Sequence, residues 1–160
     1  MKKLLIAVML ASIVSVVSAQ TFRVVLWYEA DSGLPEDAAL EMSEAVIQGA
    51  LDTWFESGVI GTNDRPRAGS LETTLAYKPG KDAMEGFVDY ELVVYADFRN
   101  NGTDYRSPDC TYRLIQVSDL ATRFAAELPA IPGVSTVKTD VDKACIRMGA
   151  EMARTSLRGR

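Results

Sequence analysis

The feature that most constrains the fold is a polar stripe of helical period within residues 35–57. Polar residues recur there at steps of four, three, four, four and four, and apolar residues fill most of the positions between them. This spacing places the polar side chains along one face of an α-helix. Pro35 suits the first helical position, and Gly58 suits the position just after the end. The stripe consists of Asp37, Glu41, Glu44, Gln48, Asp52 and Glu56.

Alternation of apolar and polar residues predicts strands on both sides of this helix. Residues 21–29 and 71–77 alternate in this way, and residues 87–98 do so most clearly. The Asn-Gly pair at 101–102 is typical of a hairpin turn, and it predicts a return strand over residues 105–117.

Two further helices are predicted toward the carboxyl end. Ser118 can cap a short helix over residues 118–128, which Pro129 would stop, and a final helix is expected over residues 139–156. The expected order is therefore β-α-β-β-β-α-α. This is an α+β fold with a mostly antiparallel sheet and with helices packed on one face.

The first 19 residues have the three parts of a cleavable secretory signal peptide. Two lysines follow the first methionine, an uncharged apolar run covers residues 4–17, and small residues precede a cleavage point after Ala19. The run is short for a membrane span, which needs about 20 apolar residues. We expect an exported protein, periplasmic or secreted, in which residues 20–160 form one domain without a stable membrane anchor after cleavage.

Composition argues against several classes of function. The leader holds two of the 17 basic residues and none of the 22 acidic ones, so the mature chain is acidic and is not expected to bind nucleic acid. Histidine is absent, which removes histidine bases and the usual histidine-containing zinc sites. We therefore expect no cofactor and no metal site.

The two cysteines, Cys110 and Cys145, predict one disulfide in an exported protein. A hairpin register with one extra residue near Pro108 places Glu91 opposite Arg113 and turns Cys110 toward the core. Cys145 lies on the apolar stripe of the final helix, which must cover the same core.

The polar stripe of the first helix has two interpretations. Nine acids and no basic residue occur between positions 24 and 64. The stripe can be a binding face for a basic protein partner, or a weak Ca²⁺ surface. It can equally be a solvated face beside the more basic final helix, which carries Lys143, Arg147 and Arg154.

Two other classes of function stay open. Asp89 and Glu91 are two residues apart on one strand, about 7 Å from each other, which is compatible with a small carboxylate-based hydrolase. Oxygen donors around the glycine in residues 97–104 are compatible with a small-ligand or ion-binding module. Arginines on a neighbouring strand explain the two acids more simply, and a hairpin turn explains the loop.

Three stretches, EAVIQGALDTWFESGVI, VDYELVVYADF and CTYRLIQVSDL, carry a resemblance. Their layout is similar to the small α/β domains of penicillin-binding-protein activator lipoproteins, the curli secretion lipoprotein and the amino-terminal domain of the Tol-system translocation protein. Residues 89–93 and 112–117 carry the closest match. This chain lacks the lipid-bearing cysteine of the lipoprotein members. The resemblance implies a non-catalytic interaction domain of the envelope, and no functional residue is carried over from it.

Export gives the first testable prediction. Signal peptidase should cleave after Ala19, because small residues precede that point and the apolar run ends just before it. The intact mass of the protein recovered outside the cytoplasm should then correspond to a chain that begins at Gln20. A mass that still includes residues 1–19 would contradict the prediction.

Overall fold

The structure is a computed structural model that describes residues 19–99 and 104–160. In chain order its elements are β1 (Thr21–Ala30), α2 (Glu36–Glu56), β2 (Ile60–Asn63), β3 (Arg67–Ala68), α3 (Leu71–Ala76), α4 (Lys81–Glu85), β4 (Tyr90–Phe98), β5 (Asp109–Gln116), β6 (Thr122–Leu128) and α5 (Lys138–Arg158). The strands form one sheet in the order β2-β1-β4-β5-β6, and β3 also pairs with β1.

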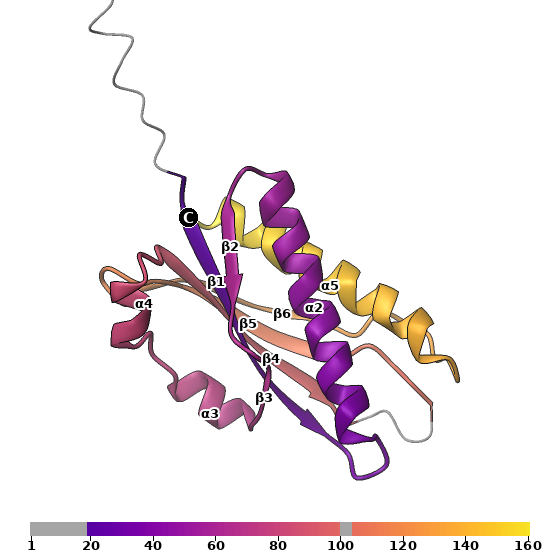
Figure 1. Ribbon diagram of the computed structural model, residues 1–160. Helices are drawn as coiled ribbons and strands as arrows, with labels where there is room; N and C mark the ends of the chain where they lie inside the picture. The colour runs from indigo at the N-terminus through magenta and orange to yellow at the C-terminus, as the bar shows by residue number, and fades with distance from the viewer. Residues whose placement is uncertain (1–18, 100–103) are drawn as a thin grey trace, which may run out of the picture.

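The α+β class is confirmed, but the sheet is mixed. β1 is parallel to β2, β3 and β4, whereas the β4–β5 and β5–β6 pairs are antiparallel. The expectation of a mostly antiparallel sheet was wrong because the long connection from β1 to β4 allows a parallel pairing, which a short hairpin does not. Helices also cover both faces: α2 and α5 lie side by side on one, and α3 and α4 lie on the other (Figure 1).

The predicted strand over residues 71–77 is wrong, since this segment forms α3. Ser70 begins the helix: its side chain accepts a hydrogen bond from the backbone N–H of Thr73 at 3.3 Å. Such a cap favours a helix over the strand that the alternation of the segment suggested.

The predicted helix over residues 118–128 is also wrong, since its second half is strand β6. Asp119 accepts a hydrogen bond from the backbone N–H of Ala121 at 2.9 Å, and Leu120 adopts a positive φ of 57°. These features make a tight turn after β5. Phe124, Ala126 and Leu128 then alternate onto the core, so the period of the segment is that of a strand.

The β4–β5 register differs from the expected one by two residues. Glu91 lies opposite Ile115, and Arg113 lies opposite Val93. A shift by two keeps every side chain on its face, so Cys110 points into the core as predicted. The predicted turn at 101–102 lies outside the described residues, and β5 begins just after Pro108.

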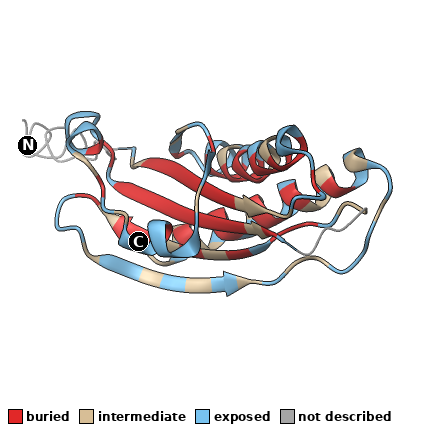
Figure 2. Ribbon diagram, turned by 90° about the horizontal axis from the view of Figure 1, so that it is seen from below, coloured by how far each residue is buried: buried red, intermediate tan, exposed pale blue. Residues whose placement is uncertain are grey.

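The main core lies between the sheet and the α2–α5 layer, and most of its residues are fully buried (Figure 2). Its aromatic centre is made by Phe22 and Trp54, whose ring centroids are 5.2 Å apart. The indole N–H of Trp54 donates a hydrogen bond to the Ser156 hydroxyl at 3.0 Å, which ties α2 to the end of α5.

Two glycines allow α2 and α5 to approach so closely. A Cβ atom added to Gly49 would lie 1.9 Å from the carbonyl oxygen of Ile146, and one added to Gly149 would lie 1.8 Å from that of Val46. Each glycine therefore faces the backbone of the other helix. Backbone atoms cannot move aside as a flexible side chain can, so only glycine fits at these two positions.

We predict that Gly49→Ala or Gly149→Ala lowers the free energy of unfolding by about 3 kcal/mol or more, because the added methyl group must push the two backbones apart. Gln48→Ala is the matched control, since Gln48 is an exposed neighbour on α2 and its loss should cost within about 0.5 kcal/mol. Urea unfolding followed by circular dichroism measures both. Equal stability of the glycine and glutamine variants would contradict this account of the crossing.

Candidate functional site

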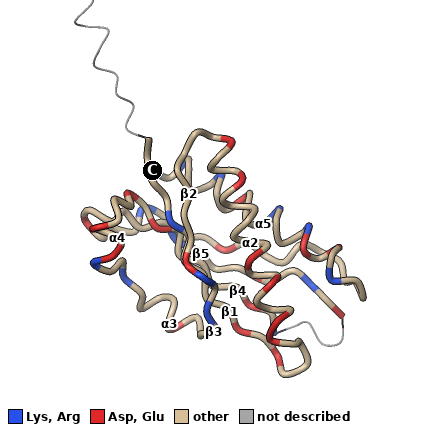
Figure 3. The backbone as a smooth tube through the Cα atoms, in the orientation of Figure 1, with Lys and Arg blue, Asp and Glu red and all other residues tan. Residues whose placement is uncertain are grey.

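The polar stripe predicted from sequence is an exposed face of α2. We define the acidic face as its six members, all of which are exposed: Asp37, Glu41, Glu44, Gln48, Asp52 and Glu56. Figure 3 shows acidic residues along α2 and basic ones on the neighbouring α5. The sequence therefore predicted both the helix and the side that it turns to solvent.

The basic residues of α5 neutralise little of the negative charge on the acidic face. Lys138 reaches Glu41, with 2.8 Å between nitrogen and oxygen. Other basic groups of α5 are held within their own helix; Arg154, for example, lies 3.2 Å from Glu151. In the part of the chain that the structure describes, Glu44 and Glu56 form no ion pair. The face thus keeps most of its negative charge.

An apolar groove adjoins the carboxyl end of the acidic face. Phe55 is 83% exposed and Ile60 is 52% exposed, which is unusual for such large apolar side chains. The helical pattern did not predict this exposure, because Phe55 is one of the apolar residues between the polar positions of the stripe. The groove measures about 570 Å³, and it is lined by Leu51, Asp52, Phe55, Gly58, Val59, Ile60 and Gly61.

The opposite face of the sheet holds a buried ion pair. Arg23 on β1 lies beside Glu91 on β4 in the parallel ladder. The Arg23 Nε donates a hydrogen bond to the Glu91 Oε1 at 2.6 Å, and a second guanidinium nitrogen contacts the same oxygen. Glu91 is 0% exposed. The sequence predicted Arg113 as the partner of Glu91, but the two-residue difference in register moves the Arg113 side chain away from it.

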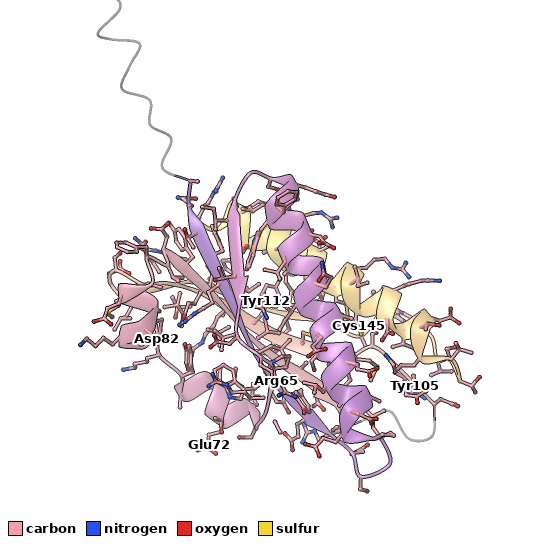
Figure 4. All side chains as sticks on the ribbon, in the orientation of Figure 1. Arg65, Glu72, Asp82, Tyr105, Tyr112 and Cys145 are labelled. Atoms are coloured by element: carbon pink, nitrogen blue, oxygen red, sulfur yellow. The ribbon has the colours of Figure 1, made fainter. Side chains whose placement is uncertain are left out.

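Tyr77 and Asp82 complete this network from the segment that covers the face. The Tyr77 hydroxyl donates to Glu91 at 3.0 Å, and Arg23 donates to Asp82 on α4 at 2.7 Å (Asp82 is labelled in Figure 4). Burial raises the pKa of Glu91, and the Arg23 guanidinium partly offsets that rise. Burial and the nearby Glu91 raise the pKa of Tyr77 to about 12, so this phenol stays protonated and keeps donating.

Arg113 and Trp27 hold α3 and the segment after it against this face of the sheet. Arg113 donates hydrogen bonds to the backbone carbonyls of Thr74 and Tyr77 at 3.0 and 2.6 Å. The rings of Trp27 and Tyr77 lie 4.9 Å apart between their centroids. The sheet side chains of this face are thus used to fasten α3 and the segment after it.

The two carboxylates considered for hydrolysis lie in different surroundings. Asp89 is exposed and accepts a hydrogen bond from the backbone N–H of Thr21 at 2.8 Å. Glu91 lies beneath Tyr77 and is ion-paired. The structure does not bring them together at one open cleft.

Cys110 and Cys145 are both buried in the main core, as the sequence predicted, and both are free thiols. The predicted disulfide is not formed in this structure. Burial raises the pKa of Cys145 to about 12 and also raises that of Cys110. Neither thiol therefore has the thiolate character that reactive cysteines need. Cys145 is labelled on α5 in Figure 4.

Within residues 19–99 and 104–160, no group of three or more acidic or cysteine side chains is placed to hold a metal ion. The candidate ion loop at 97–104 lies partly outside these ranges, and within them Asp97 contacts Arg99 at 2.6 Å. No helix in these ranges has the length and apolar character needed to cross a bilayer.

Known proteins resemble this chain in fold. No protein-family model matches the sequence, and no curated protein matches it. The PelC dodecamer from Paraburkholderia phytofirmans is 18% identical, with 84% of this chain aligned to 85% of that one and a TM-score of 0.53. TolB from Acinetobacter baumannii is 14% identical, with 89% of this chain aligned to 29% of that one and a TM-score of 0.44.

The likeness to PelC shows a shared fold. The resemblance to domains of bacterial envelope proteins, which the sequence predicted, is thereby confirmed at the level of fold.

We predict that Glu91→Ala lowers the free energy of unfolding by about 3–5 kcal/mol, because it leaves the Arg23 guanidinium buried without its main partner. Asp82→Ala is the control: its side chain is 70% exposed, so loss of its ion pair with Arg23 should lower the stability far less than loss of Glu91. Denaturant unfolding of both variants measures the difference. Equal losses of unfolding free energy in the two variants would contradict a stabilising role of the buried Arg23–Glu91 pair.

Proposed function

We propose that this chain is an exported, non-catalytic binding or assembly domain of the bacterial cell envelope, periplasmic or secreted after cleavage near Ala19. Three findings support the proposal. The fold is shared with PelC, whose solved structure is a dodecamer. Glu91 is engaged in a buried ion pair. The acidic face of α2 stays exposed and borders an apolar groove.

The proposed binding role rests mainly on Phe55, which is 83% exposed and lies next to carboxylates. Asp52 from the acidic face lines the groove with it, and Glu56 is its exposed neighbour in the chain. Many protein interfaces have an aromatic side chain at their centre that becomes buried on binding. Charged residues around it attract and orient the partner. The complementary partner is a basic protein that inserts an apolar group at Phe55.

Affinity capture from an envelope extract tests the proposal, with the mature chain from Gln20 as bait. Recovery of one stoichiometric basic protein is expected. Capture of no envelope protein, together with a strictly monomeric bait, would contradict a binding or assembly role.

The same capture gives a prediction about Phe55. Phe55→Ala should reduce affinity for the captured protein about tenfold or more, since truncation of a central aromatic residue usually costs over 1 kcal/mol of binding energy. Its thermal stability should be unchanged because the ring is exposed in the free protein. Glu44→Lys combined with Asp52→Lys should also weaken binding. Glu72→Lys, an exposed charge reversal on α3, is the control that should bind as the wild type does.

A further inference from the structure

β2 forms one margin of the sheet, beside α2 and the apolar groove. It is the first strand in the order β2-β1-β4-β5-β6, and Figure 1 shows it next to α2. Three of its four residues are exposed, and Gly61 is half-buried. Its ladder with β1 runs in unbroken register, whereas the β5–β6 ladder at the other margin shifts register between Leu114 and Ile115.

The backbone groups of β2 divide between its two sides. The N–H groups of Ile60 and Asp64 donate to carbonyls at and just before β1, at 3.2 and 3.1 Å. Successive residues of a strand direct their backbone groups to opposite sides, so those of Gly61 and Asn63 point away from β1. Within the described residues, neither of these two N–H groups has a hydrogen-bond partner. The outer side of β2 can therefore pair with another strand.

A second groove continues the Phe55 groove along the same margin. It measures about 360 Å³, and the two grooves share Leu51. Arg65 (labelled in Figure 4) and Pro66 line it where the chain leaves β2. Its other lining residues come from α2 and β2: Glu44, Ile47, Gln48, Leu51 and Asn63. The two grooves together follow β2 from Gly58 to Asn63.

An extended segment matches this shape. In such a segment every second side chain lies on the same face, about 7 Å from the next. When a peptide adds a strand to a sheet edge, main-chain hydrogen bonds supply affinity and pockets for alternate side chains supply specificity. The pocket beside Phe55 and Ile60 favours an apolar side chain, since both residues expose large apolar groups there.

Charge favours a basic residue at the next position on that face. Asp52 lines the first groove and Glu44 lines the second, and neither forms an ion pair in the part of the chain that the structure describes. Arg65 is the one basic residue among those that line the two grooves. The carboxylates therefore attract a lysine or arginine two residues away from the apolar side chain.

The short length of β2 limits what it can bind. Very short edge strands resist uncontrolled pairing with other chains. Two outward residues supply few hydrogen bonds, so backbone pairing alone holds a partner weakly. A segment binds only if its side chains also fill the grooves, and this requirement makes the pairing selective.

We propose that the partner adds a short extended strand to β2, with an apolar side chain beside Phe55 and a lysine or arginine two residues away. The inference rests on the proposed binding function and specifies how the partner of that site is held. The backbone of the segment pairs with Gly61 and Asn63, and its alternate side chains occupy the two grooves.

A labelled peptide tests the chemistry of the segment. The probe is a capped peptide that repeats Thr-Leu-Thr-Lys, so that leucine and lysine share one face when it is extended. Fluorescence anisotropy with the mature chain should show saturable binding with a Kd below about 1 mM. A peptide with glutamate in place of each lysine is the control and should bind about tenfold more weakly or worse.

Asn63→Pro tests the backbone pairing. It removes an N–H that faces away from β1, so the ladder with β1 stays intact, as for proline in natural edge strands. The variant should bind the peptide about tenfold more weakly or worse than wild type. Asn63→Ala is the matched control, because it removes the same side chain but keeps the N–H, and it should bind as wild type does. Circular dichroism checks that both variants remain folded.

Backbone N-methylation of the peptide is a second measurement that needs no variant. One peptide is methylated at its threonine nitrogens and the other at its leucine and lysine nitrogens. Only one of these two sets of N–H groups can face β2. One methylated peptide should therefore lose binding while the other keeps it.

A lysine-containing peptide that does not bind, or equal binding by Asn63→Pro and Asn63→Ala, would overturn the β2 pairing. So would equal effects of the two methylation patterns. The captured envelope protein separates this inference from the proposed function. If it binds Asn63→Pro as tightly as wild type but binds Phe55→Ala weakly, the proposed binding function stands and the β2 pairing fails.

Discussion

Arg23 and Glu91 lie on adjacent strands at the middle of the sheet, and their charges meet where almost no water reaches. A buried charge is costly unless its partner and its hydrogen bonds are in place. Here the remaining bonds come from Tyr77 and Asp82, which belong to the connection between β3 and β4. The ion pair thus requires that connection to fold over the sheet, and the cover in turn keeps the pair dry.

This arrangement determines where the protein can interact. The α2–α5 layer closes one face of the sheet through the contact at Gly49 and Gly149, and the α3–α4 segment covers part of the other. The outer side of α2 with its groove remains accessible. It offers a surface suited to another protein, which agrees with the proposed role in binding.

Periodic patterns in the sequence predicted much of the fold. The polar stripe of α2 and the alternation in β1 and β4 were strong signals because one side of each element faces the main core. The prediction failed where a local signal competed with tertiary pairing. Residues 71–77 alternate, yet Ser70 caps a helix there. The helix predicted over residues 118–128 is instead a strand from residue 122, because β5 supplies a pairing partner.

The site was only partly predictable for a related reason. Exposure of the acidic stripe follows from helical period, whereas exposure of Phe55 depends on how the chain leaves α2 at Gly58. The Arg23–Glu91 pair required the parallel alignment of β1 with β4, and no local pattern specifies that alignment. The available signal was a charged residue inside each mostly apolar strand, Arg23 in β1 and Glu91 in β4, since such charges need partners.

The most direct test of the proposed binding role is hydrogen–deuterium exchange of the wild-type protein alone and with the captured envelope protein. We expect the amides of residues 58–61, which line the apolar groove, to become more protected in the complex, while those of β6 at the far margin of the sheet do not change. Protection that stays constant at residues 58–61, or that increases at Thr122–Leu128 instead, would contradict the proposed binding role.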